Sequence, residues 1–154
     1  MLIRKTNKRG ITLLELIVVM IIIAIGAVLV APNIGVWLPN YRLRSATRDV
    51  VSALRTAQMK AVSTNIMYGV AFGANACLLY RSSGGLIPEG GPINLPGGVQ
   101  FNNNTFPVNG ALGQPFAQFN PDSTSSTGGV TLQNTKGAQR RITLTTATGR
   151  VKIE

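Results

Sequence analysis

Glu15 is the one acidic residue in a stretch from Ile11 to Pro32 that is otherwise almost wholly apolar. It lies five residues after Gly10, which ends a short basic segment. Burying an unpaired charge in hydrocarbon costs roughly 2.5–3.5 kcal/mol even on mild insertion scales. A carboxylate at this position therefore indicates a functional residue that needs a partner.

The other residues that could do chemistry are few. The chain has no histidine, so it lacks the commonest general base and the commonest metal ligand. Cys77 is the only cysteine, which excludes an intrachain disulfide. No two acidic residues stand at metal-ligand or glycosidase spacing; they are Glu15, Asp49, Glu89, Asp122 and Glu154. We therefore expect no enzyme, no metal site and no cofactor.

Basic residues outnumber acidic ones, and the formal net charge is +10. Four of the fifteen basic residues lie in 1–10, so residues 11–154 carry eleven basic and five acidic side chains, a net charge of +6. Such a domain can attract nucleic acid or another anionic surface, and it can equally be basic without such a partner.

The residues from 11 to 31 are rich in Leu, Ile and Val. A helix of this length, at about 1.5 Å per residue, just crosses a hydrocarbon core of about 30 Å. The basic residues on its N-terminal flank place the N-terminus in the cytoplasm. A secretory signal peptide is the competing interpretation, since small residues suited to cleavage occur between Ala24 and Ala31. It is disfavoured because a helical pattern resumes directly after Pro39.

That second pattern runs from Tyr41 to about Ser63 and predicts an amphipathic helix with a small, alanine-rich inner face. The inner-face residues are Ala46, Val50, Ala53, Leu54, Ala57 and Ala61. A stripe of Arg44, Arg48 and Arg55 falls on the opposing face and is expected to be solvated.

Strand patterns and glycine-rich turns follow Asn65. The expected strands are 66–73, 76–81, 99–101, 116–120, 129–132, 141–146 and 150–153, with loops over 84–98 and 122–129. Cys77 is expected to be a small buried side chain within the second strand. The predicted fold class is α+β.

The segment Lys8-Arg9-Gly10-Ile11-Thr12-Leu13-Leu14-Glu15 resembles the signal of type IV pilins and type II secretion pseudopilins. The resemblance implies that the prepilin peptidase cuts between Gly10 and Ile11 and methylates the new N-terminus, although phenylalanine is more usual than isoleucine there. It also implies that Glu15 pairs with the N-terminal ammonium of a neighbouring subunit in a filament. The alternative is that Glu15 pairs with Ile11 of its own helix, four residues away.

The remainder of the chain is similar to the GspH/FimT group of minor pseudopilins and minor pilins. This resemblance implies a pilin-like fold: a long N-terminal helix, with a transmembrane half and an amphipathic half, packed on a small antiparallel β-sheet head. The expected regions are a leader (1–10), a transmembrane or filament-core helix (11–32), its amphipathic continuation (33–65) and a periplasmic head (66–154). The absence of a C-terminal cysteine pair and of an acidic calcium loop favours a minor subunit. The implied partners are the prepilin peptidase, other pilins or pseudopilins, and the inner membrane, with Trp37 and Tyr41 in the interfacial aromatic belt.

In the FimT branch, a C-terminal Gly-Arg-x-Arg motif contributes to DNA binding during transformation. The matching residues are Gly149, Arg150 and Lys152, so lysine replaces the second arginine and loses its bidentate fork for phosphate. Arg140 and Arg141 on the preceding strand are expected to join them across a hairpin and to bind phosphate without sequence preference. The alternative is a solvated sheet edge, where basic residues discourage aggregation.

Overall fold

The computed structural model describes residues 11–154, apart from the side chains of residues 29–34 and 36. The chain divides into two compact units, Met1–Trp37 and Leu38–Glu154, which are described separately below. The expected leader, residues 1–10, lies outside the described residues, and so does Gly10 on one side of the expected cleavage bond.

One helix, α1 (Leu13–Thr64), begins in the first unit and ends in the second. In the first unit every side chain from Ile11 to Val28 is exposed, including the large aliphatic ones. Within the residues that the structure describes, no helix has the length and apolar character needed to cross a membrane. A membrane span over 11–32 therefore stays a prediction.

In the second unit, α1 buries the alanine-rich face that the sequence predicts. Its six expected inner residues are all buried, and Leu43, Thr47 and Val51 extend the same face. Small side chains there let the helix approach the strands closely. The helix stops at Thr64, and Asn65 follows it in the left-handed conformation (φ 55°) that commonly ends helices.

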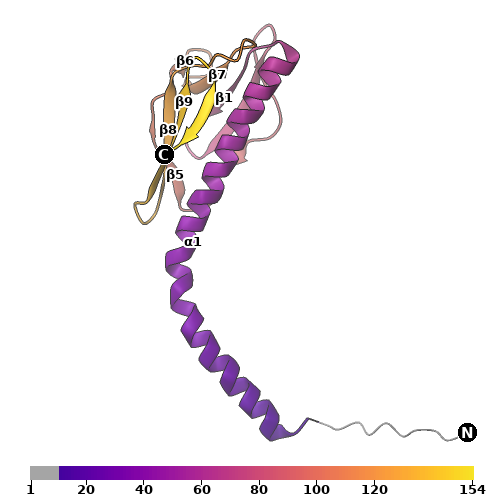
Figure 1. Ribbon diagram of the computed structural model, residues 1–154, viewed down its shortest axis with the longest axis vertical. Coiled ribbons are helices and arrows are strands. Elements are labelled where there is room, and N and C mark those ends of the chain that lie inside the picture. Colours follow the sequence, from indigo (N-terminus) through magenta and orange to yellow (C-terminus); the bar gives the residue numbers. More distant parts are fainter. Residues whose placement is uncertain (1–10) are drawn as a thin grey trace, which may run out of the picture. The chain divides into compact units, whose positions relative to one another are not determined.

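The strands form two antiparallel sheets (Figure 1). The larger sheet has the order β3-β2-β1-β7-β6, with β4 also paired to β2. Its strands are β1 (Tyr68–Phe72), β2 (Ala76–Ser82), β3 (Leu86–Pro88), β4 (Ile93–Asn94), β6 (Val108–Asn109) and β7 (Gln114–Phe119). The smaller sheet has the order β10-β9-β8-β5 and consists of β5 (Val99–Asn104), β8 (Gly128–Asn134), β9 (Gln139–Thr145) and β10 (Arg150–Ile153).

All seven strands expected from the sequence are present, as β1, β2, β5, β7, β8, β9 and β10. The prediction of an unbroken loop over 84–98 is wrong, because β3 and β4 pair with the outer edge of β2. The two-residue strand β6, which pairs with β7, was also not predicted. Strands of two or three residues are too short to show an alternating pattern. The predicted α+β, pilin-like fold class is confirmed.

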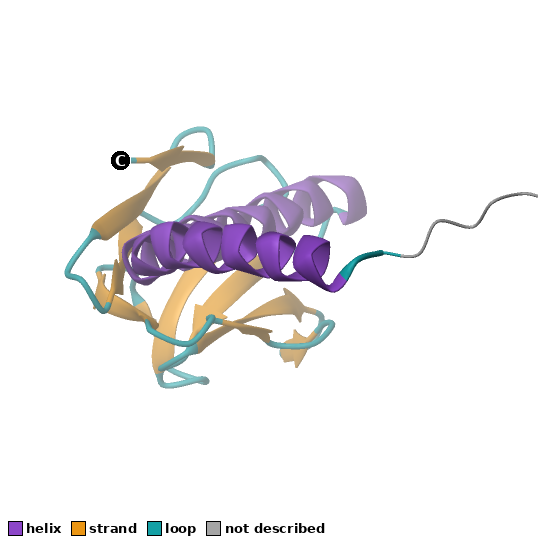
Figure 2. Cartoon of the chain, turned by 90° about the horizontal axis from the view of Figure 1, so that it is seen from below, coloured by secondary structure: helices purple, strands orange, loops and turns teal. Residues whose placement is uncertain are grey.

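The core lies between the second half of α1 and the two sheets, whose strands curve around this part of the helix (Figure 2). Phe72 of β1 connects the sheets, since its ring lies 5.5 Å from those of both Phe101 and Phe106. Cys77 is buried in this core, as predicted.

Three side-chain hydrogen bonds join α1 to the head. Asn134 donates to Asn40 (3.0 Å), Arg42 donates to the carbonyl of Gly97 (3.0 Å), and Gln58 donates to the carbonyl of Thr148 (3.0 Å). Together with the apolar core, they fix the helix against the smaller sheet.

Candidate functional site

Thr12 caps the N-terminus of α1. Its side-chain oxygen accepts a hydrogen bond from the backbone N–H of Glu15 (3.2 Å), and its carbonyl accepts one from the N–H of Leu16 (3.2 Å). Thr12 and Glu15 thus occupy the positions of a capping box, in which a Thr is followed three residues later by Glu. The sequence contains this Thr-x-x-Glu signal, but its capping role was not recognised there.

Ile11 and Glu15 lie on the same face of the first unit. With Leu16, Val19, Met20 and Ile23 they border a shallow groove whose surface is mostly apolar. Glu15 supplies the only carboxylate of this groove, and its side chain is exposed. The arrangement places one charge, available to a partner, among aliphatic side chains that are also available for packing.

The hairpin of β9 and β10 carries the predicted basic residues, but it does not bring all four together. Side chains alternate between the faces of a strand, and Ile142 and Leu144 point into the core. Arg140 therefore shares the helix-facing side, while Arg141 lies on the outer side. Arg150 pairs with Thr145 and Lys152 with Thr143, which places both on the outer side with Arg141.

One of these outer basic residues is already paired. The ammonium of Lys152 lies 3.0 Å from a carboxylate oxygen of Glu154, and this hydrogen bond lowers the pKa of the Glu154 carboxyl. Both groups are largely exposed, so the pair contributes little to stability. It does reduce the net positive charge of the outer face to that of Arg141 and Arg150.

Gly149 shapes the turn that joins β9 to β10. It has φ +60°, and a Cβ placed there would lie 2.7 Å from Nε2 of Gln58 and 2.8 Å from the carbonyl of Ser123. Glycine is required by both the left-handed conformation and the close approach of α1. The structure therefore gives Gly149 a packing role apart from any role in binding.

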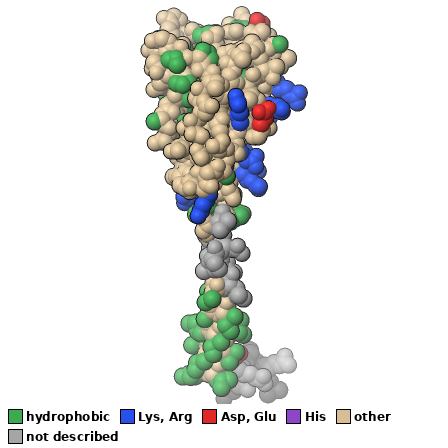
Figure 3. Space-filling view, turned by 90° about the vertical axis from the view of Figure 1, so that its left-hand side faces the viewer, with side chains coloured by type: hydrophobic (Ala, Val, Ile, Leu, Met, Phe, Trp, Pro, Cys, Tyr) green, Lys and Arg blue, Asp and Glu red, His purple; other side chains and the backbone are tan. Residues whose placement is uncertain are grey.

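Arg140 instead joins the arginine stripe of α1. Arg44, Arg48 and Arg140 surround a hollow of about 270 Å³ with Thr47 and Ile153. A second hollow, of about 350 Å³, continues along α1 past Arg55 to Met59 and shares Arg48 and Ile153 with the first. In the space-filling view, Lys and Arg side chains gather along one flank of the second unit (Figure 3). The sequence predicted a solvated stripe, and the three arginines of α1 are indeed exposed.

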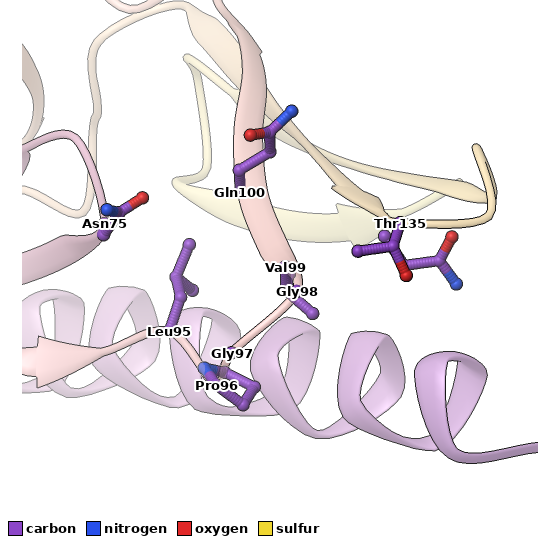
Figure 4. A pocket seen from close by; sticks show the side chains of 9 residues that line it. Asn75, Leu95, Pro96, Gly97, Gly98, Val99, Gln100 and Thr135 are labelled. Atoms are coloured by element: carbon purple, nitrogen blue, oxygen red, sulfur yellow. The ribbon is translucent and has the colours of Figure 1, made fainter. Parts of the chain in front are cut away.

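A third hollow lies beside the Gly97-Gly98 turn and has a volume of about 320 Å³ (Figure 4). It is lined by backbone, by Leu95, Pro96 and Val99, and by the neutral polar side chains of Asn75, Gln100, Asn134 and Thr135. Its lining contains no ionisable side chain, so it offers no general acid or base.

Two further ionisable groups have structural roles. Burial raises the pKa of the Cys77 thiol to about 11, with the nearby charge of Asp49 acting in the same direction. The thiol is therefore protonated and unreactive at neutral pH. Lys60 of α1 pairs with Glu89 beyond β3, and this hydrogen bond lowers the pKa of Glu89 and raises that of Lys60. Among the residues that the structure describes, no three metal-ligating side chains lie together.

A long N-terminal helix that packs its second half on curled antiparallel sheets defines a pilin-like protein. The comparisons with known proteins agree with this class. Residues 5–31 match the prokaryotic N-terminal methylation motif, and residues 46–148 match the type II transport protein GspH family. The second match covers most of the chain, which thus belongs to the GspH family of pilin-like subunits. Trp37 and Tyr41 are exposed, and their place at a membrane interface stays a prediction.

Two solved structures are similar to this chain. The minor pseudopilin EpsH from the type 2 secretion system of Vibrio cholerae matches with a TM-score of 0.60 and 10% identity, over 73% of this chain and 96% of EpsH. The type IV minor pilin FimU of Pseudomonas aeruginosa matches with a TM-score of 0.55 and 14% identity, over 75% of this chain and 90% of FimU. At these identities the likeness establishes the fold alone. No curated protein matches the chain.

Proposed function

We propose that this chain is a minor subunit of a pilus-like filament, in a type II secretion pseudopilus or a type IV pilus. The observation that carries the proposal is the order of two matches in one chain: a methylation motif over 5–31, then a GspH domain over 46–148. In this role the prepilin peptidase cleaves between Gly10 and Ile11 and methylates Ile11. The segment 11–32 anchors the subunit in the inner membrane, with the head in the periplasm, until the subunit joins the tip or the initiation complex of the filament.

Glu15 has the assembly role in this proposal. The exposed aliphatic side chains between Ile11 and Val28 leave water when helices of neighbouring subunits pack together. The carboxylate of Glu15 then needs a cation, and the ammonium of Ile11 from a neighbouring subunit supplies it. Such a pair sets the axial position of one subunit against the next, and the exposure of both Ile11 and Glu15 supports it.

The role in a machine is tested by deleting the gene and scoring two phenotypes, protein secretion and DNA uptake. We expect the loss of at least one of them, with restoration by the full chain and not by the Glu15→Ala variant. Wild-type secretion, DNA uptake and filament formation in the deletion strain would contradict the proposal.

A second candidate function is binding of extracellular DNA without sequence preference, in the manner of a FimT-like minor pilin. It is favoured by Arg141, Arg150 and Lys152, which share the outer face of β9 and β10. The pairing of Lys152 with Glu154 and the position of Arg140 on the other face both reduce the charge available there. A DNA site on this face therefore depends mainly on Arg141 and Arg150.

The full chain, held in detergent, should retard duplex DNA at low salt if this second function holds. The double substitution Arg141→Ala with Arg150→Ala should abolish the retardation, whereas Lys136→Ala, which removes one positive charge on the β8–β9 turn, should not. Because each phosphate contact releases counterions, binding must weaken steeply with salt. No retardation by the unsubstituted chain would leave the assembly role alone.

A further inference from the structure

A groove runs along the second half of α1 beside the edge of the smaller sheet. It consists of the two hollows that share Arg48 and Ile153, and we name it the arginine groove. It is lined by Arg44, Thr47, Arg48, Val51, Ser52, Arg55, Thr56, Met59, Arg140 and Ile153. From Arg44 to Met59 the helix rises about 22 Å, the length of an extended segment of about six or seven residues.

The arginine groove has four guanidinium groups and no acidic side chain in its lining. Within the described part of the chain, the ion pairs are Lys60–Glu89 and Lys152–Glu154, so none of these arginines has a carboxylate partner. Asp49, the acidic residue that follows Arg48 in the helix, is not part of this lining. The side chains that line the groove therefore carry a net positive charge.

The smaller sheet has an open edge at β10, the last strand in its order. Arg141 exchanges both backbone hydrogen bonds with Glu154, which fixes the alternation of the β9–β10 ladder. Lys152 and Arg150 precede Glu154 in steps of two residues, so their backbone N–H and C=O groups also point toward β9. The N–H and C=O groups of Val151 and Ile153 consequently point away from β9, at the open edge. Each of these two residues offers one donor and one acceptor to an added strand.

From this charge and this edge, we propose that the arginine groove binds an extended, acidic segment of a different protein, which adds as a strand to β10. The acidic side chains of that segment face the arginines and lay their aliphatic carbons on Met59 and Ile153, while the alternate apolar side chains point to the opposite face of the sheet. Arg44 and Arg48 are about 6 Å apart along the helix axis, close to the spacing of alternate residues in an extended strand. The proposal concerns the second unit only and does not rest on the assembly role of Glu15.

Two other occupants fit the groove less well. A nucleic acid backbone offers phosphate oxygens, which only accept hydrogen bonds, so it would leave the outward carbonyls of Val151 and Ile153 without donors. A second copy of this chain has no suitable segment, because its five acidic residues are scattered singly along the sequence. An acidic peptide of another protein supplies both the charge and the alternating donors and acceptors.

The test uses the full chain in detergent and a fluorescent peptide of about eight residues in which glutamate alternates with valine. Fluorescence anisotropy at low salt measures its affinity. A second peptide of equal charge, with proline in place of valine, cannot form the ladder. On the protein side, Ile153→Pro removes one outward N–H and leaves the ladder to β9 intact, while Ile153→Ala removes the same apolar contact and keeps the N–H.

We expect the alternating peptide to bind and the proline peptide to bind at least about tenfold more weakly. Ile153→Pro should weaken binding about fivefold more than Ile153→Ala does, the effect of one net hydrogen bond. Arg48→Ala should weaken binding by up to about fivefold, and more at low salt than at high salt. Far-UV circular dichroism checks that each variant is folded, and Arg48→Ala keeps the test valid should Ile153→Pro unfold the head.

Three results would overturn the proposal. One is no binding of the alternating peptide by the unsubstituted chain. Another is equal affinity for the two peptides, or equal effects of Ile153→Pro and Ile153→Ala, since both would show attraction by charge without strand addition. The third is displacement of the peptide by an oligodeoxythymidylate whose own affinity falls with Arg48→Ala but not with Ile153→Pro. That result would assign the groove to nucleic acid.

Discussion

The substitution Glu15→Gln separates two roles that the structure allows for Glu15. Thr12 and Glu15 stand at the two positions of a capping box, with the Thr12 side chain bonded to the Glu15 N–H at 3.2 Å. Glutamine serves at this position of a capping box as well as glutamate does. Glu15→Gln therefore keeps the start of α1 and removes only the charge.

The two roles differ widely in free energy. In the single chain Glu15 is exposed, and a pair with the amine of its own Ile11 contributes about 0.2–0.5 kcal/mol. Removing one member of a desolvated pair between subunits costs about 2–5 kcal/mol, because the other charge is left buried and unpaired. That cost lowers the association constant between about 30-fold and 5000-fold.

Filaments sheared from cells, with the subunit detected by immunoblot, measure this effect. We expect Glu15→Gln to remain in the cell fraction and to be lost from the sheared fraction, with unchanged helix content in purified protein. The matched control is Thr12→Ala, which removes the cap, costs about 0.5–2 kcal/mol at the helix start and keeps the charge. It should still reach the sheared fraction.

The opposite pattern would refute this reasoning. If Glu15→Gln assembled like the unsubstituted chain while Glu15→Ala and Thr12→Ala did not, Glu15 would act through the cap and the intersubunit ion pair would be wrong.

Three further predictions concern the head. Gly69→Ala should lower the free energy of unfolding by about 1–3 kcal/mol in denaturant titrations, because the added Cβ would lie 2.2 Å from an aromatic ring of β7. Gly91→Ala is the control: its added Cβ would have no atom within 4 Å, so the free energy of unfolding should not change. Glu89→Gln should lower the thermal midpoint at pH 7 and leave it unchanged in acid. Lys60 lowers the pKa of Glu89 in the folded chain, so the ion pair stabilises the fold above the ordinary glutamate pKa. This stabilisation is lost as the pH falls through the lowered pKa of Glu89. Alkylation of Cys77 at pH 8 should be about a hundredfold slower in the folded chain than in denaturant. The reason is that burial raises the pKa of the Cys77 thiol from 9.0 to about 11. Equal rates would mean that the thiol is accessible in the folded chain.

The elements with a clear period could be predicted from the sequence. The alanine-rich face of α1 and the seven longer strands all show in the spacing of apolar residues, and the structure has each of them. The strands β3, β4 and β6 could not be predicted, because a strand of two or three residues is defined by its neighbour and not by its own pattern. The Thr12 cap was present in the sequence as Thr-x-x-Glu.

The basic surfaces show a different limit. The sequence predicts four basic residues near one hairpin, but which face each takes depends on the register of β9 against the core. That register places Arg140 with Arg44 and Arg48, almost a hundred residues earlier in the chain. A groove between a helix and a sheet edge depends on how the two dock, which local spacing does not encode.

The mass of the mature N-terminal peptide tests the central claim most directly. Protein purified from membranes or filaments of the producing cells, digested and analysed by mass spectrometry, should begin at Ile11 and carry one added methyl group on its amine. A mature chain that begins at any other residue, or that keeps residues 1–10, would contradict the assignment to a prepilin-processed subunit.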